Sequence, residues 1–217
     1  MFDFDGVEGM IFDCDGTILD SMDAWEEAER DLLLQAPALT QEDEDFFHSA
    51  PIEEACAFLH EKFGVGASGE EVLEHLDSRL MKFYSKEAIA LPGAIEFVLE
   101  ARKHCIPCVV LSSSPRRYLH AGLSRVDIVD EFVELIATDE VGFSKMDHEI
   151  YEHALEILGS SKETTWAIDD AIYANRIIHE FGIKTIAPVN GRGGDVRAEL
   201  ASYADIVVET LEELIGE

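Results

Sequence analysis

Positive charge is scarce in this sequence. Only 16 Lys and Arg stand against 46 Asp and Glu in 217 residues, a net charge of −30, and none of the 16 precedes Arg30. This balance excludes a general affinity for nucleic acid or an anionic membrane, because both need a basic surface. We therefore expect neither as a partner. An anionic substrate would need a local positive field, which a divalent cation supplies most simply.

Cysteine and long apolar runs are also rare. Four cysteines are too few for a disulfide scaffold, and no apolar run approaches the roughly 18–20 residues of a membrane-spanning helix. The N-terminal residues lack the basic and apolar regions of a secretory signal. These absences predict a cytoplasmic protein with reduced thiols. Hydrophobic residues nevertheless make up 47% of the chain, which is enough to bury a core.

Short apolar runs alternate with longer segments of helical period. Strands are expected at residues 9–12, 106–111, 134–138, 165–168, 183–187 and 205–208. Helices are expected at residues 94–103, 116–126, 147–158 and 171–181. This alternation predicts an α/β fold, a Rossmann-like parallel sheet covered by helices. The glycine-rich residues 191–194 are interpreted as a turn.

Residues 21–89 interrupt this alternation, because no strand is expected there. We predict an all-helical domain at 21–89, inserted into an α/β core domain that consists of residues 1–20 and 90–217. An acidic stretch at residues 41–45 is interpreted as a solvated loop and the start of a helix. The helical patterns of the insertion cover residues 24–34, 52–63 and 70–84.

Two acidic pairs follow expected strands. Asp13 and Asp15 come directly after the first strand, and Asp169 and Asp170 follow a later one. Ligands of open parallel sheets bind at the carboxyl ends of strands, and Gly16 gives the chain freedom to turn there. Two unit charges about 4 Å apart repel by roughly 4 kcal/mol at an effective dielectric of about 20. Converging carboxylates therefore need a cation, and hard oxygen ligands favour Mg²⁺.

Hydroxyl groups and a lysine complete the expected site. Ser112, Ser113 and Ser114 follow the second expected strand and precede a helix, where hydroxyls and backbone N–H groups can cradle a phosphate. Lys145 follows the third expected strand and could place a positive charge between the carboxylates and a phosphoryl group.

Taken in this order, the Asp-x-Asp-Gly-Thr sequence, the serine, the lysine and the Asp-Asp pair resemble the four motifs of the haloacid dehalogenase superfamily. The helical insertion resembles the C1 cap domain of that family, and the subfamily resembled is that of the phosphatases and β-phosphoglucomutase-like proteins. The resemblance implies a Mg²⁺ cofactor with Asp13, Asp15, Asp169 and Asp170 as its ligands.

The resemblance also implies a phosphoaspartyl mechanism. Asp13 would attack phosphorus as the nucleophile, and Asp15 would protonate the leaving oxygen and then activate water. Ser112 would hold a phosphoryl oxygen, and Lys145 would orient the nucleophile. The dehalogenases and phosphonatases of the family lack an acid two residues after the nucleophile, so Asp15 favours phosphate transfer from oxygen.

Two features depart from the family pattern. Residues 3–7, Asp-Phe-Asp-Gly-Val, repeat the first motif, but the two residues before them are too few for a core strand, so we favour the copy at Asp13. The residues after Lys145 lack the prolines that are usual in the third motif. Lys162 is the alternative lysine, although its position is typical of a surface residue at a helix start.

We interpret the sequence as that of a Mg²⁺-dependent phosphatase of a small phosphorylated metabolite, such as a sugar phosphate. Ser113, Arg116 and His48 are the candidate substrate-binding residues. A catalytically inactive relative that binds a phosphorylated metabolite or a protein is an alternative. The oligomeric state, monomer or dimer, stays open.

The nearest enzymatic alternative is a β-phosphoglucomutase-like sugar phosphomutase. The mutases resembled carry a histidine about twelve residues after the nucleophile, where this chain has Trp25. A mutase must also bind a second phosphate, yet residues 47–54 contain no Arg or Lys. Arg116 and Arg117 keep the alternative open, because either could meet a distal phosphate.

Overall fold

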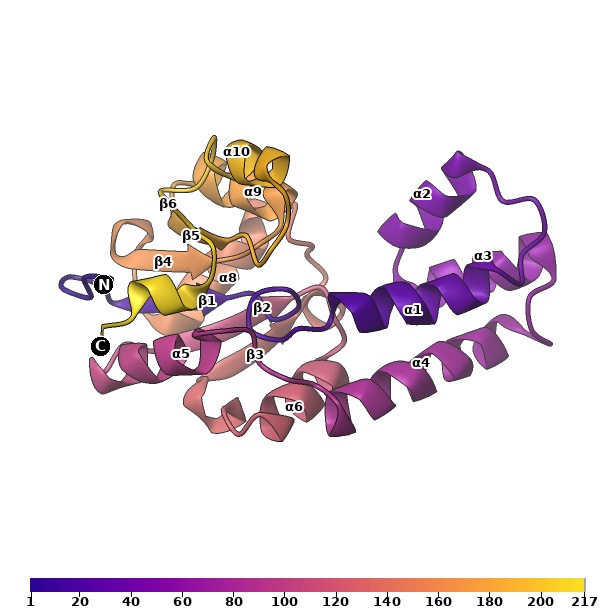
Figure 1. Cartoon of the computed structure of the whole chain (residues 1–217), viewed down its shortest axis with the longest axis horizontal. Helices are drawn as coiled ribbons and strands as arrows, with labels where there is room; N and C mark the ends of the chain where they lie inside the picture. Colours follow the sequence, from indigo (N-terminus) through magenta and orange to yellow (C-terminus); the bar gives the residue numbers. More distant parts are fainter. Residues whose placement is uncertain (217) are drawn as a thin grey trace. The chain divides into compact units, whose positions relative to one another are not determined.

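The structure is a computed structural model that describes residues 1–216, without the side chains of Asp45, His48 and Ser49. The chain divides into two compact units, one formed by Met1–Asp20 with Ala88–Glu217 and the other by Ser21–Glu87. Figure 1 shows the first unit as a sheet flanked by helices and the second as a group of helices.

The first unit is built on a parallel sheet. Within the described residues, six strands lie in the order β3-β2-β1-β4-β5-β6, and every pairing is parallel. Each strand lies within two residues of its expected position, which confirms the α/β fold with a Rossmann-like sheet. The strands are β1 (Gly9–Phe12), β2 (Cys108–Ser112), β3 (Glu134–Ala137), β4 (Thr165–Ile168), β5 (Lys184–Pro188) and β6 (Ile206–Val208).

Strand β1 lies at the point where the order of the strands along the chain reverses across the sheet. Strands β2 and β3 lie on one side of it, and β4, β5 and β6 lie on the other. Phe12, the last residue of β1, pairs with Val110 of β2 and Ile168 of β4. Open parallel sheets bind ligands at the carboxyl ends of their strands at such a switch point. The residues after Phe12 and Ile168 therefore stand where a ligand is expected.

Helices cover both faces of this sheet. On one face, Ile11 packs in a core cluster with residues of α8 and α9. On the other face, Phe12 contacts Phe97 of α5, with ring centroids 6.2 Å apart. Burial on both faces explains why β1 is an unbroken apolar run, without the alternation of a half-exposed strand. The helices are α5 (Ala94–Lys103), α6 (Arg116–Arg125), α7 (Thr138–Val141), α8 (His148–Leu158), α9 (Ile172–Phe181) and α10 (Gly194–Leu200).

The second unit is helical. Helix α4 buries Val72, Leu76, Leu80 and Tyr84, which are spaced four residues apart and therefore form one stripe along the helix. The expected helices of this segment are present with ends within two residues of expectation. Among the described residues, no helix is both long and apolar enough to cross a membrane. The helices are α1 (Met22–Leu33), α2 (Gln41–Ser49), α3 (Ile52–Phe63) and α4 (Gly69–Lys86).

The acidic stretch at residues 41–45 begins helix α2, which confirms the expected helix start, but it contains none of the expected loop. Thr40 and Asp43 form a capping box: the Thr40 hydroxyl accepts from the N–H of Asp43, and the Asp43 carboxylate accepts from the N–H of Thr40. Acidic residues in a first helical turn are also stabilised by the helix dipole. The negative charges thus favour the helix at this position.

Candidate active site

The first strand ends in a tight turn that carries two aspartates. Asp13 continues the pairing of β1 with β4, since its N–H donates to the carbonyl of Ile168 at 2.8 Å. The carbonyl of Cys14 accepts from the N–H of Leu19 at 2.8 Å, which folds the chain back. The φ angle of Gly16 is 80°, a left-handed conformation that glycine adopts without strain.

Three carboxylates meet beyond the ends of β1 and β4. Asp13, Asp169 and Asp170 are buried, and one oxygen of each lies within 4.8 Å of the others. Burial, together with the neighbouring carboxylates, raises the pKa of Asp13 well above its usual value. Burial and then Asp169 raise the pKa of Asp170 to about 6. Hard oxygen donors that are buried and repel one another suit a divalent cation, so these residues could hold one.

Lys145 joins two of these carboxylates. Its Nζ donates to Oδ1 of Asp13 at 2.5 Å and to Oδ2 of Asp169 at 2.7 Å, and the residue is 3% exposed. Burial opposes the charged form, but Asp13 and Asp169 outweigh it and keep the pKa of Lys145 well above its usual value. The ammonium group is therefore a fixed positive charge inside the cluster.

The loop that carries Lys145 holds its shape without the prolines of the family pattern. The Asp147 carboxylate accepts from both the N–H and the hydroxyl of Ser144 at 2.8 Å. The hydroxyl of Tyr151 donates to the carbonyl of Lys145 at 3.1 Å. Hydrogen bonds from the loop itself and from α8 thus fix the backbone that presents the lysine.

Asp15 points to a different group of side chains. Its Oδ2 accepts from the hydroxyl of Ser114 at 2.7 Å and from that of Ser112 at 3.4 Å. The N–H of Ser114 in turn donates to the Ser112 hydroxyl at 3.1 Å. The two aspartates of the first motif therefore have different surroundings, which two groups with different protonation tasks require.

The structure gives different surroundings to two of the predicted substrate-binding residues. Ser113 is exposed and shares a hydrogen bond with the hydroxyl of Tyr173. Arg116 pairs with Glu134 at 2.6 Å and with Glu140 at 3.7 Å, which accounts for its charge without a ligand. The side chain of His48 lies outside the described residues. Substrate contacts of all three residues stay predictions.

Three further residues contact the site and were not found from the sequence. The Thr17 hydroxyl donates to Oδ1 of Asp170 at 3.1 Å, Tyr173 reaches Ser113, and Arg192 pairs with Oδ2 of Asp170 at 2.9 Å. Thr17 could have been identified from the sequence, because it belongs to the Asp-x-Asp-Gly-Thr motif. Arg192 lies in the glycine-rich loop after β5, and no sequence motif links it to Asp170.

We expect the substitution Gly16→Ala to disrupt the carboxylate cluster. A Cβ atom at Gly16 would lie 2.8 Å from Oδ2 of Asp170, and the φ of 80° would itself cost a non-glycine residue about 1–2 kcal/mol. The carboxylate would have to move, so the phosphatase activity that the family resemblance implies should fall by about tenfold or more, as a phosphate-release assay measures.

Gly159→Ala is the matched control for this prediction. Gly159 has a φ of 68°, but an added Cβ would meet nothing within 4 Å. The Gly159→Ala variant should therefore unfold at a lower temperature because of backbone strain, while its activity stays unchanged. Equal activity of the two variants would show that the space beside Asp170 is not needed.

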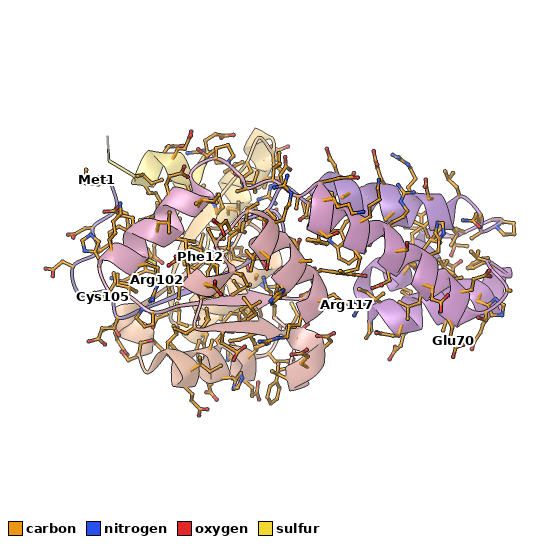
Figure 2. All side chains as sticks on the ribbon, turned by 90° about the horizontal axis from the view of Figure 1, so that it is seen from below. Met1, Phe12, Glu70, Arg102, Cys105 and Arg117 are labelled. Carbon is orange, nitrogen blue, oxygen red and sulfur yellow. The ribbon has the colours of Figure 1, made fainter. Side chains whose placement is uncertain are left out.

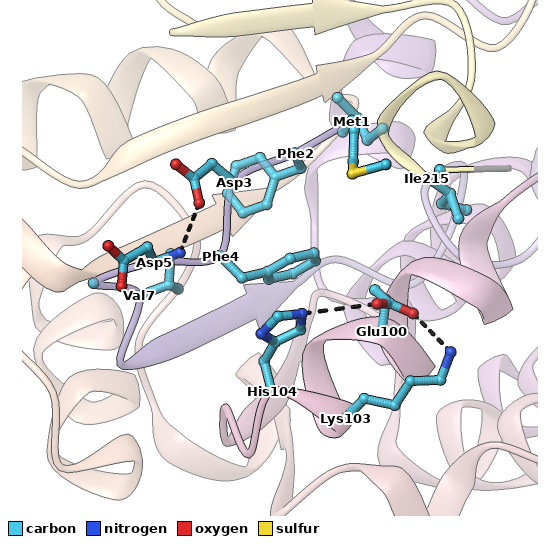
Figure 3. A pocket seen from close by; sticks show the side chains of 13 residues that line it. Met1, Phe2, Asp3, Phe4, Asp5, Val7, Glu100, Lys103, His104 and Ile215 are labelled. Atoms are coloured by element: carbon cyan, nitrogen blue, oxygen red, sulfur yellow. Dashed lines mark hydrogen bonds and ion pairs between the residues drawn. The ribbon is translucent and has the colours of Figure 1, made fainter.

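The second Asp-x-Asp copy lies at the other end of β1. Asp3 and Asp5 are exposed and line a cavity of about 820 Å³, together with Glu100, Lys103 and His104 (Figure 3). Figure 2 labels Met1 and Cys105 at one end of the first unit and Arg117 at its other end. This copy precedes the amino end of the strand, away from the carboxylate cluster.

Comparisons with known proteins agree on one family. The sequence model of the haloacid dehalogenase-like hydrolases matches residues 7–190. A phosphorylated carbohydrates phosphatase from Thermotoga maritima is 26% identical over 96% of this chain and 97% of its own length. Hexitol phosphatase B from Escherichia coli is 24% identical over 75% of this chain and 74% of its own length.

Solved structures share the fold. The structure of CbbY from Rhodobacter sphaeroides, in complex with phosphate, superposes with a TM-score of 0.77 at 21% identity and covers 96% of each chain.

Proposed function

This chain belongs to the haloacid dehalogenase-like hydrolase family, and we propose that it is a Mg²⁺-dependent phosphatase of small phosphorylated carbohydrates or similar phosphomonoesters. One observation carries the proposal: buried Lys145 bridges Asp13 and Asp169, beside an acid, Asp15, that is held apart by serine hydroxyls. A nucleophile, a separate acid and a fixed positive charge are the groups that phosphoryl transfer needs. The names of the phosphatase relatives support the substrate class.

The residues present fit a magnesium ion. Asp13, Asp169 and Asp170 provide buried carboxylate oxygens that converge within 4.8 Å, and the family resemblance adds the backbone carbonyl of Asp15. Hard oxygen donors of this kind are the ligands that Mg²⁺ prefers. When bound, the cation offsets the charge of the phosphoryl oxygens and of the carboxylates that face them.

In the first proposed step, a carboxylate oxygen of Asp13 attacks phosphorus and the bond from phosphorus to the substrate oxygen breaks. Asp15 gives its proton to that leaving oxygen, so the alcohol departs neutral. Lys145 holds Oδ1 of Asp13 at 2.5 Å, which orients the nucleophile and limits the repulsion between carboxylate and phosphate.

In the second proposed step, water attacks the phosphorus of the phosphoaspartate. Asp15 takes a proton from this water, the bond from phosphorus to Asp13 breaks, and phosphate leaves. Ser112 and the N–H groups that follow it hold phosphoryl oxygens, because they lie at the end of β2 just before α6. Asp15 returns to its protonated state, and the cycle closes.

We propose that the helical unit acts as the cap domain that selects the substrate. A phosphomutase is less well supported by this unit. The indole N–H of Trp25, at the position of the mutase histidine, donates to the hydroxyl of Tyr84 at 2.7 Å. An indole has no titratable group in the physiological range, so it cannot replace the acid–base function of a histidine.

The test is phosphate release from 4-nitrophenyl phosphate and a panel of sugar and sugar-alcohol phosphates, with Mg²⁺ and with a chelator. We expect release in Mg²⁺ that the chelator abolishes, because the carboxylate cluster cannot accept a phosphate dianion without a cation. Release that is equal with chelator would contradict the metal role. No release from any compound would contradict the phosphatase, and hexose phosphate interconversion would then be measured to test the mutase.

A further inference from the structure

Arg192 is held against the candidate metal site by several contacts. Its Nη1 lies 2.9 Å from Oδ2 of Asp170, and its Nη2 donates to the carbonyl of Asp170 at 2.8 Å and of Pro188 at 3.1 Å. Its Nε donates to the carbonyl of Val189 at 3.0 Å. Three carbonyls of the surrounding loops thus fix the guanidinium on one oxygen of a carboxylate that could hold the cation.

We propose that Arg192 competes with the divalent cation for Asp170 and thereby lowers the affinity of the site for the cation. This inference rests on the proposed function, which assigns Asp170 to the cation. Arg192 is a positioning residue in this proposal, since it acts through Asp170 and touches no reacting atom.

The charges of the site support competition. Within the described residues, Lys145 pairs with Asp13 and Asp169, and Arg192 pairs with Asp170. The buried carboxylates are therefore largely neutralised before any cation arrives, and an incoming cation meets a weaker field than three bare carboxylates would provide. Arg192 should therefore lower the affinity of the site for a cation.

The two positive side chains differ in what they can do when a cation binds. Lys145 has an exposed side-chain fraction of 4%, so it has no solvent to move into, whereas the side chain of Arg192 is 36% exposed. A guanidinium near the surface can exchange its contacts with Asp170 and the carbonyls for hydrogen bonds to water, whereas a buried ammonium group cannot. Arg192 is therefore the group that yields Asp170 to the cation.

The orientation of Asp170 does not depend on Arg192 alone, and for this reason we expect the cation affinity to rise when Arg192 is removed. The hydroxyl of Thr17 donates to Oδ1 of Asp170 at 3.1 Å and accepts from its N–H at 3.1 Å. Gly16 leaves room for the carboxylate, because an added Cβ would lie 2.8 Å from Oδ2. Removal of Arg192 should thus leave Asp170 in place and remove only a competing charge.

The experiment is a titration of metal-free protein with Mn²⁺, followed by the electron paramagnetic resonance signal of the free ion, without substrate. We expect Arg192→Gln to bind Mn²⁺ about tenfold more tightly than the unchanged protein. Arg192→Lys keeps the charge but loses the contacts of the guanidinium with the carbonyls, so its Mn²⁺ affinity should lie between those of the unchanged protein and Arg192→Gln. Asp170→Asn should bind Mn²⁺ at least about tenfold more weakly.

Arg197→Gln is the matched control. Arg197 lies on α10 and pairs with Glu209 at 3.4 Å, so its removal takes away the same charge from the same part of the chain without touching Asp170. Its Mn²⁺ affinity should equal that of the unchanged protein. Equal or weaker binding by Arg192→Gln would overturn the proposal, as would equal tightening by Arg197→Gln.

The titration is independent of catalysis, so its failure is distinct from a failure of the proposed function. Tighter binding by Arg192→Gln in a protein that releases no phosphate would support the competition and contradict the phosphatase. Unchanged binding in a protein that does release phosphate would overturn the role of Arg192 alone. Circular dichroism of Arg192→Gln and Arg192→Lys checks the fold. If the glutamine variant does not fold, the lysine variant is titrated in its place, and Mn²⁺ binding equal to or weaker than that of the unchanged protein would then overturn the proposal.

Discussion

Substitution of Asp13 by Asn should lower the turnover number on the order of 10⁴-fold or more while the fold is kept. An amide cannot form the phosphoaspartate, whereas it matches the carboxylate in shape and can still accept a hydrogen bond from Lys145, now 2.5 Å from Oδ1. The measurement is Mg²⁺-dependent phosphate release under saturating substrate, with far-ultraviolet circular dichroism as the check on folding.

The second Asp-x-Asp copy supplies the control for this substitution. Asp3→Asn and Asp5→Asn make the same chemical change in the same local pattern, but both residues are exposed at the amino end of β1. Both variants should keep the turnover number. Full activity of Asp13→Asn, or loss of activity in Asp5→Asn, would assign the nucleophile to another residue.

Substitution of Lys145 by Met should lower the free energy of unfolding of the metal-free protein by about 3–5 kcal/mol, because it leaves buried carboxylates without their charge partner. Lys145 contacts Asp13 and Asp169 and is 3% exposed, so water cannot replace it. Urea unfolding in the presence of a chelator measures the change. Added Mg²⁺ should restore part of the loss, since it supplies positive charge to the same carboxylates.

Lys162→Met is the matched control, and it also tests the alternative lysine. Lys162 lies over the ring of Phe181 at 3.4 Å and is partly exposed. Its substitution should change the free energy of unfolding by about 1 kcal/mol or less. Comparable losses in the two variants would show that Lys145 is not the buried partner of the cluster.

The loss in Lys145→Met should depend on pH in a defined direction. The pKa of Asp170 is about 6 in the folded protein, above its ordinary value of 3.8, and that of Asp13 is also raised. A carboxyl with a raised folded pKa contributes stability that is complete below the unfolded pKa and is lost as pH rises through the folded one. Lys145 lowers the pKa of both carboxyls, so its removal destabilises their charged forms and leaves their neutral forms largely unaffected. Lys145→Met should therefore approach the unchanged protein near pH 4 and fall furthest below it above pH 6. An equal loss of unfolding free energy at pH 4 and pH 8 would show that the destabilisation does not come from the charged carboxylates.

Local sequence determined the sheet and the order of the chemical groups along it. The short apolar or β-branched runs before Asp13 and Asp169 form strands at the expected residues, because a parallel strand covered on both faces has few polar positions. The aspartates follow the carboxyl ends of those strands, and neighbouring parallel strands bring such ends together. The α/β fold and the meeting of these carboxylates were therefore predictable.

The position of Lys145 after the third expected strand predicted a positive charge beside these carboxylates, and the family resemblance implied that it orients Asp13. Only the tertiary structure decided that Lys145 bridges Asp13 and Asp169. It also decided that Arg192 meets Asp170, through a glycine-rich loop whose sequence indicated no more than a turn. Strands and helices follow from the period of apolar residues, which is a local property of the chain. The pairing of Arg192 with a buried carboxylate follows from the paths of two loops and from desolvation, which exist only once the sheet has formed, so no local pattern in the sequence indicated it.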